Sequence, residues 1–224
     1  AQAIGMTNTV FNNSHGLDEV TQNKSTAYDM ALLSSYASHN EIYMKIVGTK
    51  KYSVQSDRKS YLWHNRNKLL TSYNYTTGGK TGYTPSAGRT LVTNASKNNL
   101  NLTVVTLNDG NEYQTHEELY EYAFSKYQNY VILNPKKFKI DDAYYPDKVY
   151  ILNQFTYPLT EEEKEQVKVL VKLTKLNQYR DKDQVGVVIV KLGDKEIYSE
   201  KVYVKVESTK KKNIFSRIWS WLFD

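Results

Sequence analysis

The feature that most constrains the fold is a change of residue pattern near Val131. Before this point, helical and strand-like patterns alternate along the chain. After it, β-branched and aromatic residues dominate the segments KVYILN, KVLVKL, VGVVIVKL and KEIYSEKVYVKV, a composition that favours strands. The segment LGDKE between the last two favours a hairpin. The pattern predicts an α/β domain over residues 1–130 and a small all-β domain over 131–207, with the boundary around residues 129–135.

Two segments of the first part have the signature of a helix. Residues 25–39 and 115–127 each place apolar side chains along one face at helical spacing. Each also begins with Thr and an acidic residue three positions later, the spacing of an N-terminal capping box: Thr26 with Asp29, and Thr115 with Glu118. We therefore expect both helices to begin at these threonines.

The rest of the first part favours extended structure. Residues 42–63 are polar and are expected to form short strands and turns. A strand is expected over 79–84, ending at the proline that follows, and two more over 88–95 and 100–109. Residues 97–99, Lys-Asn-Asn, supply the turn between the last two strands.

Charge and composition exclude several classes of function. The chain has 224 residues and a net charge of +6, so nucleic acid, an anionic membrane and an anionic wall polymer are all possible partners. No zinc-finger spacing, RNP-like aromatic strand or arginine cluster supports nucleic acid. There is no cysteine, no HxxxH or HExxH pattern among the four histidines and no phosphate-binding glycine loop. We therefore expect no nucleic-acid partner, no cofactor and no metal.

Residues 1–12 do not have the composition of a signal peptide. They lack a basic start and an apolar core, and no run in the chain reaches the 18 apolar residues of a membrane span. Two interpretations follow: a cytosolic protein, or a gene that starts upstream of Ala1. The motifs described below favour the second.

The last segment, 208–224, combines a lysine cluster with an amphipathic pattern. Three lysines, 210–212, precede NIFSRIWSWLFD. On a helix one face gathers the bulky apolar residues Ile214, Phe215, Ile218, Trp221 and Leu222. One interpretation is a terminal helix packed on the protein; the favoured one is an amphipathic membrane-anchor helix lying in the interface, since the segment is too short to span.

The triplet Lys80-Thr81-Gly82, within GGKTGYTPSAG, carries the most specific chemistry. A Lys-Thr-Gly triplet on a strand is one of three motifs of the penicillin-recognising serine enzymes. Lys80 offers a compact positive charge, and Thr81 a hydroxyl donor, to the C-terminal carboxylate of a peptide or of a β-lactam. Gly82 has no side chain, so a substrate backbone can lie against the strand. In isolation the triplet is a weak signal, and a turn is the favoured interpretation.

Four further segments strengthen this interpretation. They are FNNSHGLDE (11–19), KSTAYDMALLSSYA (24–37), HNRNKLL (64–70) and AGRTLVTNAS (87–96). In order and spacing they resemble the serine-type D-Ala-D-Ala carboxypeptidases, the low-molecular-weight penicillin-binding proteins of the bacterial cell wall. The resemblance implies that residues 1–130 are part of a β-lactamase/transpeptidase-like domain of antiparallel strands and helices.

The resemblance also implies an activity and a location. Such enzymes remove the terminal D-Ala of peptidoglycan stem pentapeptides through a serine acyl-enzyme, are inhibited by β-lactams and lie on the outer face of the bacterial cytoplasmic membrane. It places the backbone N–H of Tyr83 in an oxyanion hole and Arg66 near the carboxylate pocket, where Arg66 could equally be a solvated surface residue. His116 falls where some members have a basic residue beginning the last helix, and an ordinary helix start is favoured there.

The main departure from the family is the absence of its other two motifs. Ser-x-x-K and Ser-x-Asn precede the HGL segment in the family, and this chain starts just before that segment. Short matches occur at Ser56–Lys59, Ser72–Asn74 and Ser208–Lys211, where chance explains them. We therefore expect no catalytic residue in these 224 residues, and an inactive chain. The alternative is a non-catalytic remnant that binds wall or membrane.

Overall fold

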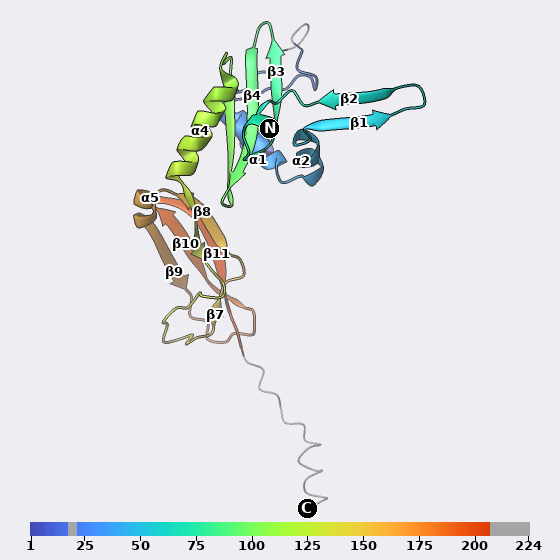
Figure 1. Cartoon of the computed structure of the whole chain (residues 1–224). Helices are drawn as coiled ribbons and strands as arrows, with labels where there is room; N and C mark the ends of the chain where they lie inside the picture. Colours follow the sequence, from blue (N-terminus) through green and yellow to red (C-terminus); the bar gives the residue numbers. More distant parts are fainter. Residues whose placement is uncertain (18–21, 207–224) are drawn as a thin grey trace, which may run out of the picture. The chain divides into compact units, whose positions relative to one another are not determined.

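The structure is a computed structural model that describes residues 1–17 and 22–206, and it contains two compact units (Figure 1). The first comprises Ala1–Gln128 and the second begins at Asn129. The predicted anchor helix, 208–224, lies outside the described residues. Within the described part, no helix is both long and apolar enough to cross a membrane.

The first unit consists of a three-stranded antiparallel sheet with helices on both faces and a separate hairpin. Its elements in chain order are η1 (Gln2–Ile4), α1 (Ala27–Ala37), α2 (Glu41–Val47), β1 (Lys51–Gln55), β2 (Ser60–His64), α3 (Leu69–Ser72), β3 (Thr76–Thr84), β4 (Gly88–Lys97), β5 (Leu100–Leu107) and α4 (Glu112–Lys126). The sheet order is β3-β4-β5, and β1 pairs only with β2 among the described strands.

Hydrogen bonds from neighbouring residues of β4 show that α1 and α4 cover opposite faces of the sheet. Asn94 accepts a hydrogen bond from Ser34 of α1 at 3.1 Å, whereas Thr93 is bonded to His116 of α4 at 2.7 Å. Successive side chains of a strand point to opposite faces. Leu91 and Ala95, also on β4, are almost completely buried. The middle strand is therefore the core of this unit.

The predicted helix over residues 25–39 is confirmed as α1, and one of the two hydrogen bonds of the expected capping box forms. The Thr26 hydroxyl accepts a hydrogen bond from the backbone N–H of Asp29 at 3.1 Å. The Asp29 carboxylate, which is buried, accepts from the Asn8 N–H at 2.8 Å and from the Thr9 hydroxyl at 2.6 Å. This carboxylate thereby ties the N-terminal segment to the start of α1.

Two expectations about helices are wrong. Residues 41–47 form the short helix α2 instead of extended chain, because the Asn40 side chain accepts from the N–H of Tyr43 at 3.0 Å and so caps a helix. Helix α4 begins at Glu112, three residues before Thr115. The N–H of Thr115 already donates to the Asn111 carbonyl at 3.0 Å, so Thr115 lies inside the helix and cannot cap it.

The predicted strands of the first unit are present, with longer bounds. β3 begins at Thr76, three residues earlier than expected, and ends at Thr84 before the proline. The turn between β4 and β5 is confirmed: Asn98 and Asn99 have φ of 53° and 63°. Asn tolerates this left-handed conformation, which a two-residue hairpin turn requires at both positions.

The second unit contains two antiparallel sheets and one short helix. Its elements are β6 (Gln128–Leu133), β7 (Val149–Tyr150), β8 (Phe155–Leu159), α5 (Glu161–Glu165), β9 (Val167–Leu173), β10 (Gln184–Leu192) and β11 (Lys195–Val204). The sheet orders are β7-β11-β10-β9 and β6-β8. The predicted hairpin at LGDKE joins β10 to β11, with Gly193 at φ 59°.

The sequence pattern predicted an all-β domain here, and the structure corrects this, because the second unit also contains the helix α5. Helix α5 begins with a capping box in which the Thr160 hydroxyl accepts from the Glu163 N–H and the Glu163 carboxylate accepts from the Thr160 N–H. The core of the unit is built on alternating valines of β10 and β11 around the fully buried ring of Tyr145. The Tyr145 hydroxyl donates to the Thr174 carbonyl at 2.8 Å.

Candidate functional site

The Lys80-Thr81-Gly82 triplet lies on β3, at the edge of the three-stranded sheet. In the β3–β4 register Lys80 is opposite Val92, Thr81 opposite Leu91 and Gly82 opposite Thr90. No other described strand pairs with the outer edge of β3. Such an edge presents backbone N–H and C=O groups with which an extended peptide can pair.

The two sides of β3 carry different chemistry. Residues directly opposite each other in an antiparallel pair share a face. Thr81 and Tyr83 therefore lie on the face of the sheet that α4 covers, and Lys80 lies on the face that α1 covers. The Lys80 ammonium donates to the neighbouring Thr81 carbonyl. The charge of Lys80 is thus on one face of the β3 edge and the hydroxyl of Thr81 is on the other.

Glycines in β3 are required by the close approach of β4. Gly79 has φ 149°, and a Cβ at this position would lie 2.3 Å from the Val92 carbonyl oxygen. A Cβ on Gly82 would lie 2.4 Å from the Thr90 hydroxyl oxygen. Both distances are far shorter than a van der Waals contact. The Val92 oxygen belongs to the backbone, so a side chain at Gly79 would push the strands apart, whereas the Thr90 side chain could rotate away from a Cβ on Gly82.

An open hollow of about 1880 Å³ contains all five residues that the sequence predicts for the site. They are Arg66, Lys80, Thr81, Gly82 and Tyr83. The hollow is also lined by residues 11–17, the segment containing His15-Gly16-Leu17. Segments separated by about seventy positions in the sequence are thus brought to one place by the fold.

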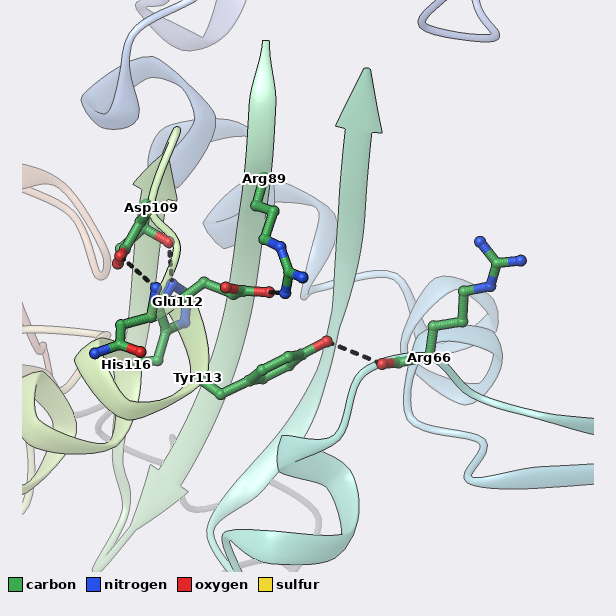
Figure 2. Close-up of polar contacts among 8 residues, drawn as sticks. Arg66, Arg89, Asp109, Glu112, Tyr113 and His116 are labelled. Atoms are coloured by element: carbon green, nitrogen blue, oxygen red, sulfur yellow. Dashed lines mark hydrogen bonds and ion pairs between the residues drawn. The ribbon is translucent and has the colours of Figure 1, made fainter. Parts of the chain in front are cut away.

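The main chain at Arg66 is held by the first turn of α4. The Tyr113 hydroxyl donates to the Arg66 carbonyl oxygen at 3.0 Å, as Figure 2 shows, while the Arg66 guanidinium points away from this contact. The Asn65 side-chain oxygen accepts from the backbone N–H of Asn67 at 2.9 Å. Arg66 therefore projects from a fixed loop at the side of the hollow.

The fold also places an ion pair in the hollow that the sequence analysis missed. Arg89, at the start of β4, is bonded through Nη1 to Oε1 of Glu112 at 3.1 Å (Figure 2). Both residues line the hollow together with the triplet. The two lie 23 positions apart on different elements, so no local sequence pattern indicates their contact.

His116 lies within α4 and is fully buried, which corrects the expectation of an ordinary helix start. Its Nδ1 is hydrogen-bonded to Thr93 at 2.7 Å and its Nε2 to Thr106 at 3.1 Å. The Thr93 hydroxyl is also bonded to that of Tyr120 at 2.8 Å. Burial lowers the pKa of His116 to about 4, because the charged imidazolium is poorly solvated there. The neutral ring thus joins α4 to β4 and β5.

The serines that formally match catalytic motifs lie away from the hollow. Ser56 is in the turn between β1 and β2, where its hydroxyl donates to the Lys59 carbonyl at 3.0 Å. Ser72 ends α3 and donates to the Glu117 carboxylate at 3.0 Å. Neither lines the hollow, and Ser208 lies outside the described residues.

Comparison with known proteins gives consistent matches. Residues 1–111 match the family of peptidase S11, D-alanyl-D-alanine carboxypeptidase. The chain is 29% identical to the D-alanyl-D-alanine carboxypeptidase DacA of Haemophilus influenzae, over 99% of this chain and 58% of that protein. It is 31% identical to DacF of Bacillus subtilis, over 58% of this chain and 34% of that protein. The chain therefore spans less than three fifths of the length of these relatives.

A solved structure supports the same fold. The crystal structure of penicillin binding protein 5 from Haemophilus influenzae superposes with a TM-score of 0.68 at 24% identity, covering 92% of this chain and 62% of that one. At this identity the likeness establishes the fold of mixed helices and antiparallel sheets. The family match over residues 1–111 and the curated relatives confirm the resemblance predicted from the motifs: this chain is similar to the D-alanyl-D-alanine carboxypeptidases.

Proposed function

We propose that this chain is part of a D-alanyl-D-alanine carboxypeptidase of peptidoglycan maturation, which removes the terminal D-Ala from stem pentapeptides. The observation that carries the proposal is the Lys80-Thr81-Gly82 triplet on an edge strand, in a hollow that also gathers Arg66 and residues 11–17. The names of its relatives support the same activity.

Different residues of β3 bind different parts of the peptide. Lys80 and Thr81 bind the C-terminal carboxylate through a charge and a hydroxyl, with Arg66 adding positive charge nearby. Gly82 lets the peptide backbone approach the strand edge. The N–H of Tyr83 donates to the oxygen of the scissile carbonyl as negative charge develops on it. Holding the leaving D-Ala in this way fixes the carbonyl for attack.

The reaction proceeds through a covalent intermediate. A serine oxygen attacks the carbonyl carbon of the penultimate D-Ala, its proton passes to a base and from there to the leaving nitrogen, and the C–N bond breaks to release D-Ala. Water then hydrolyses the ester and regenerates the serine. A β-lactam carbonyl is attacked in the same way, and its ring opening leaves a stable ester, so β-lactams are the expected inhibitors.

We propose that the serine and its lysine base belong to residues encoded upstream of Ala1, so that the 224 residues alone are catalytically inactive. Supporting this, Lys80 and Thr81 line the described part of the hollow while Ser56 and Ser72 lie elsewhere. The alternative is a non-catalytic remnant that grips wall peptide or membrane. A start codon close to Ala1 would favour this remnant over the enzyme.

Labelling with a fluorescent penicillin separates these possibilities. The 224-residue chain should show no covalent band on a denaturing gel. The chain extended by the upstream reading frame should label, and should lose the label when the serine of its Ser-x-x-K motif is replaced by alanine. A labelled band from the 224 residues alone would contradict the proposal and would direct attention to Ser56. An upstream frame without the motif would favour the remnant.

The proposed location is the outer face of a bacterial cytoplasmic membrane, with wall peptide as substrate and the membrane surface as a second partner through 210–224. We also propose that the two compact units are separate domains, the first binding substrate. The described residues support this division by the break at Gln128.

A further inference from the structure

The ion pair between Arg89 and Glu112 lies beside the substrate-binding triplet and has no role in the function proposed above. Arg89 is opposite Tyr83 in the β3–β4 register and so shares a face with Tyr83 and Thr81. Thr81 is its diagonal cross-strand neighbour, a separation that a long side chain can span. A guanidinium at this position can therefore approach the hydroxyl of Thr81 from the α4 side.

Arg89 is held in place from several directions. Its carbonyl oxygen accepts from the backbone N–H of Asp109 at 3.1 Å. Gly88 before it has φ 66°, and a Cβ there would lie 2.0 Å from the Asn108 side-chain oxygen, so this end of β4 packs tightly against the loop before α4. The guanidinium meets the Glu112 carboxylate (Figure 2). The main chain at Arg89 is therefore fixed, and Glu112 orients the guanidinium.

The two partners differ in exposure. The Glu112 side chain is 9% exposed, whereas that of Arg89 is 59% exposed. A nearly buried carboxylate needs a paired cation, which Arg89 supplies through Nη1. Among the described residues this is the single acceptor of the guanidinium. The fork of five donors thus has N–H groups left for a second, exposed carboxylate, which it can bind in bidentate fashion.

The charges around the hollow favour an anionic ligand. Its described lining carries four cationic side chains and one carboxylate, that of Glu112. They are Lys24, Arg66, Lys80 and Arg89. An ion pair that served only to join β4 to α4 would not need to lie exposed in this hollow. Arg89 instead presents most of its side chain to solvent beside Thr81.

We propose that Arg89 is a second binding residue for the C-terminal carboxylate of the substrate, and that Glu112 positions it. Lys80 and Arg89 then bring positive charge to this carboxylate from opposite faces of β3, with the Thr81 hydroxyl between them. This inference rests on the proposed function, because it assigns a specificity-determining residue to the same site. It predicts that recognition of a free C-terminus depends on Arg89.

Binding to the 224-residue chain tests the inference without any need for turnover. N-acetyl-D-Ala-D-Ala and its C-terminal amide are titrated against the ¹⁵N-labelled chain and followed by NMR. The chain should bind the acid more tightly than the amide. Arg89→Ala should reduce this preference about tenfold, because a hydrogen-bonded charged contact is lost. Arg89→Lys should recover part of it, and Glu112→Gln should weaken it while the Arg remains.

Controls separate the possible failures. Arg58→Ala, in the β1–β2 turn outside the hollow, should leave the preference unchanged. If Lys80→Ala removes the preference but Arg89→Ala does not, the inference is wrong and the proposed carboxylate site stands. If the unmodified chain does not distinguish acid from amide, both are overturned. If Arg89→Ala does not fold, Arg89→Gln replaces it, because glutamine can still hydrogen-bond to Glu112. This variant should show the same loss of preference for the acid over the amide.

Discussion

His116 shows how one buried residue couples the stability of the first unit to pH. Its pKa is lowered to about 4 in the folded chain by burial, from an ordinary value of 6.5. Between these two values the unfolded chain binds a proton that the folded chain does not, so stability rises with pH. The contribution is complete above the unfolded pKa and is lost as pH falls toward 4.

We predict that the first unit loses about 2 kcal/mol of its free energy of unfolding between pH 7 and pH 5 through His116. His116→Gln should be less stable at pH 7, because hydrogen bonds to Thr93 and Thr106 are altered, but its stability should change less with pH. Hydrogen exchange of amides in β4 and α4 measures both effects. His39→Gln, at the exposed end of α1, is the matched control and should keep the dependence of the unmodified chain. If the stability of His116→Gln depends on pH as strongly as that of the unmodified chain, His116 does not couple stability to pH.

At the scale of elements, the geometry of β3 depends on glycines that bring it against β4. Gly79→Ala should lower the free energy of unfolding by on the order of 2–4 kcal/mol. The residue has φ 149°, which strains any side chain, and the new Cβ would collide with the Val92 carbonyl.

Differential scanning calorimetry tests this prediction against a second glycine. Gly110 is exposed in the loop before α4, and a Cβ there would meet nothing within 4 Å. Gly110→Ala should therefore change stability by no more than about 0.5 kcal/mol. A loss of similar size in both variants would mean that general helix and loop propensities, and not the β3–β4 contact, set the cost.

The elements that the sequence predicted are those with local signals. Thr26 caps α1 as its position indicates, although Asp29 does not complete the capping box, and Asn98-Asn99 form the expected turn. Helix α2 was missed because seven residues are too few to show a helical repeat. The start of α4 was misplaced because Thr115 has capping-box spacing but lies inside the helix.

At the scale of the whole molecule, the motifs named residues that the fold brings together, while the role of these residues in binding stays a prediction. Arg66 and the triplet were named from short segments, and the fold brings all of them into one hollow. The Arg89–Glu112 pair was not predicted, since each residue alone is an ordinary surface charge and only the packing of α4 on the sheet brings them together. A contact between two elements that are distant in the chain leaves no pattern in the sequence of either element.

The last prediction is that residues 210–224 attach the chain to a membrane surface. Residues 210–224 place Ile214, Phe215, Ile218, Trp221 and Leu222 at helical spacing beside three lysines. Burying a large apolar side chain contributes about 1.5–3 kcal/mol at full depth and less in an interface. Each lysine adds about 1 kcal/mol near an anionic surface, reduced by salt. These contributions suffice for reversible attachment in the plane of the membrane.

Vesicle co-sedimentation of the full chain and of a chain lacking 210–224 tests this attachment. Binding to vesicles containing anionic phosphatidylglycerol should disappear with the deletion, weaken as salt is raised and be much lower on neutral phosphatidylcholine vesicles. The melting temperature should change little, because a segment that binds lipid need not pack on the protein. If the segment packs on the protein instead, the opposite results are expected. The deletion would then lower the melting temperature by several degrees, and the full chain would not sediment with vesicles.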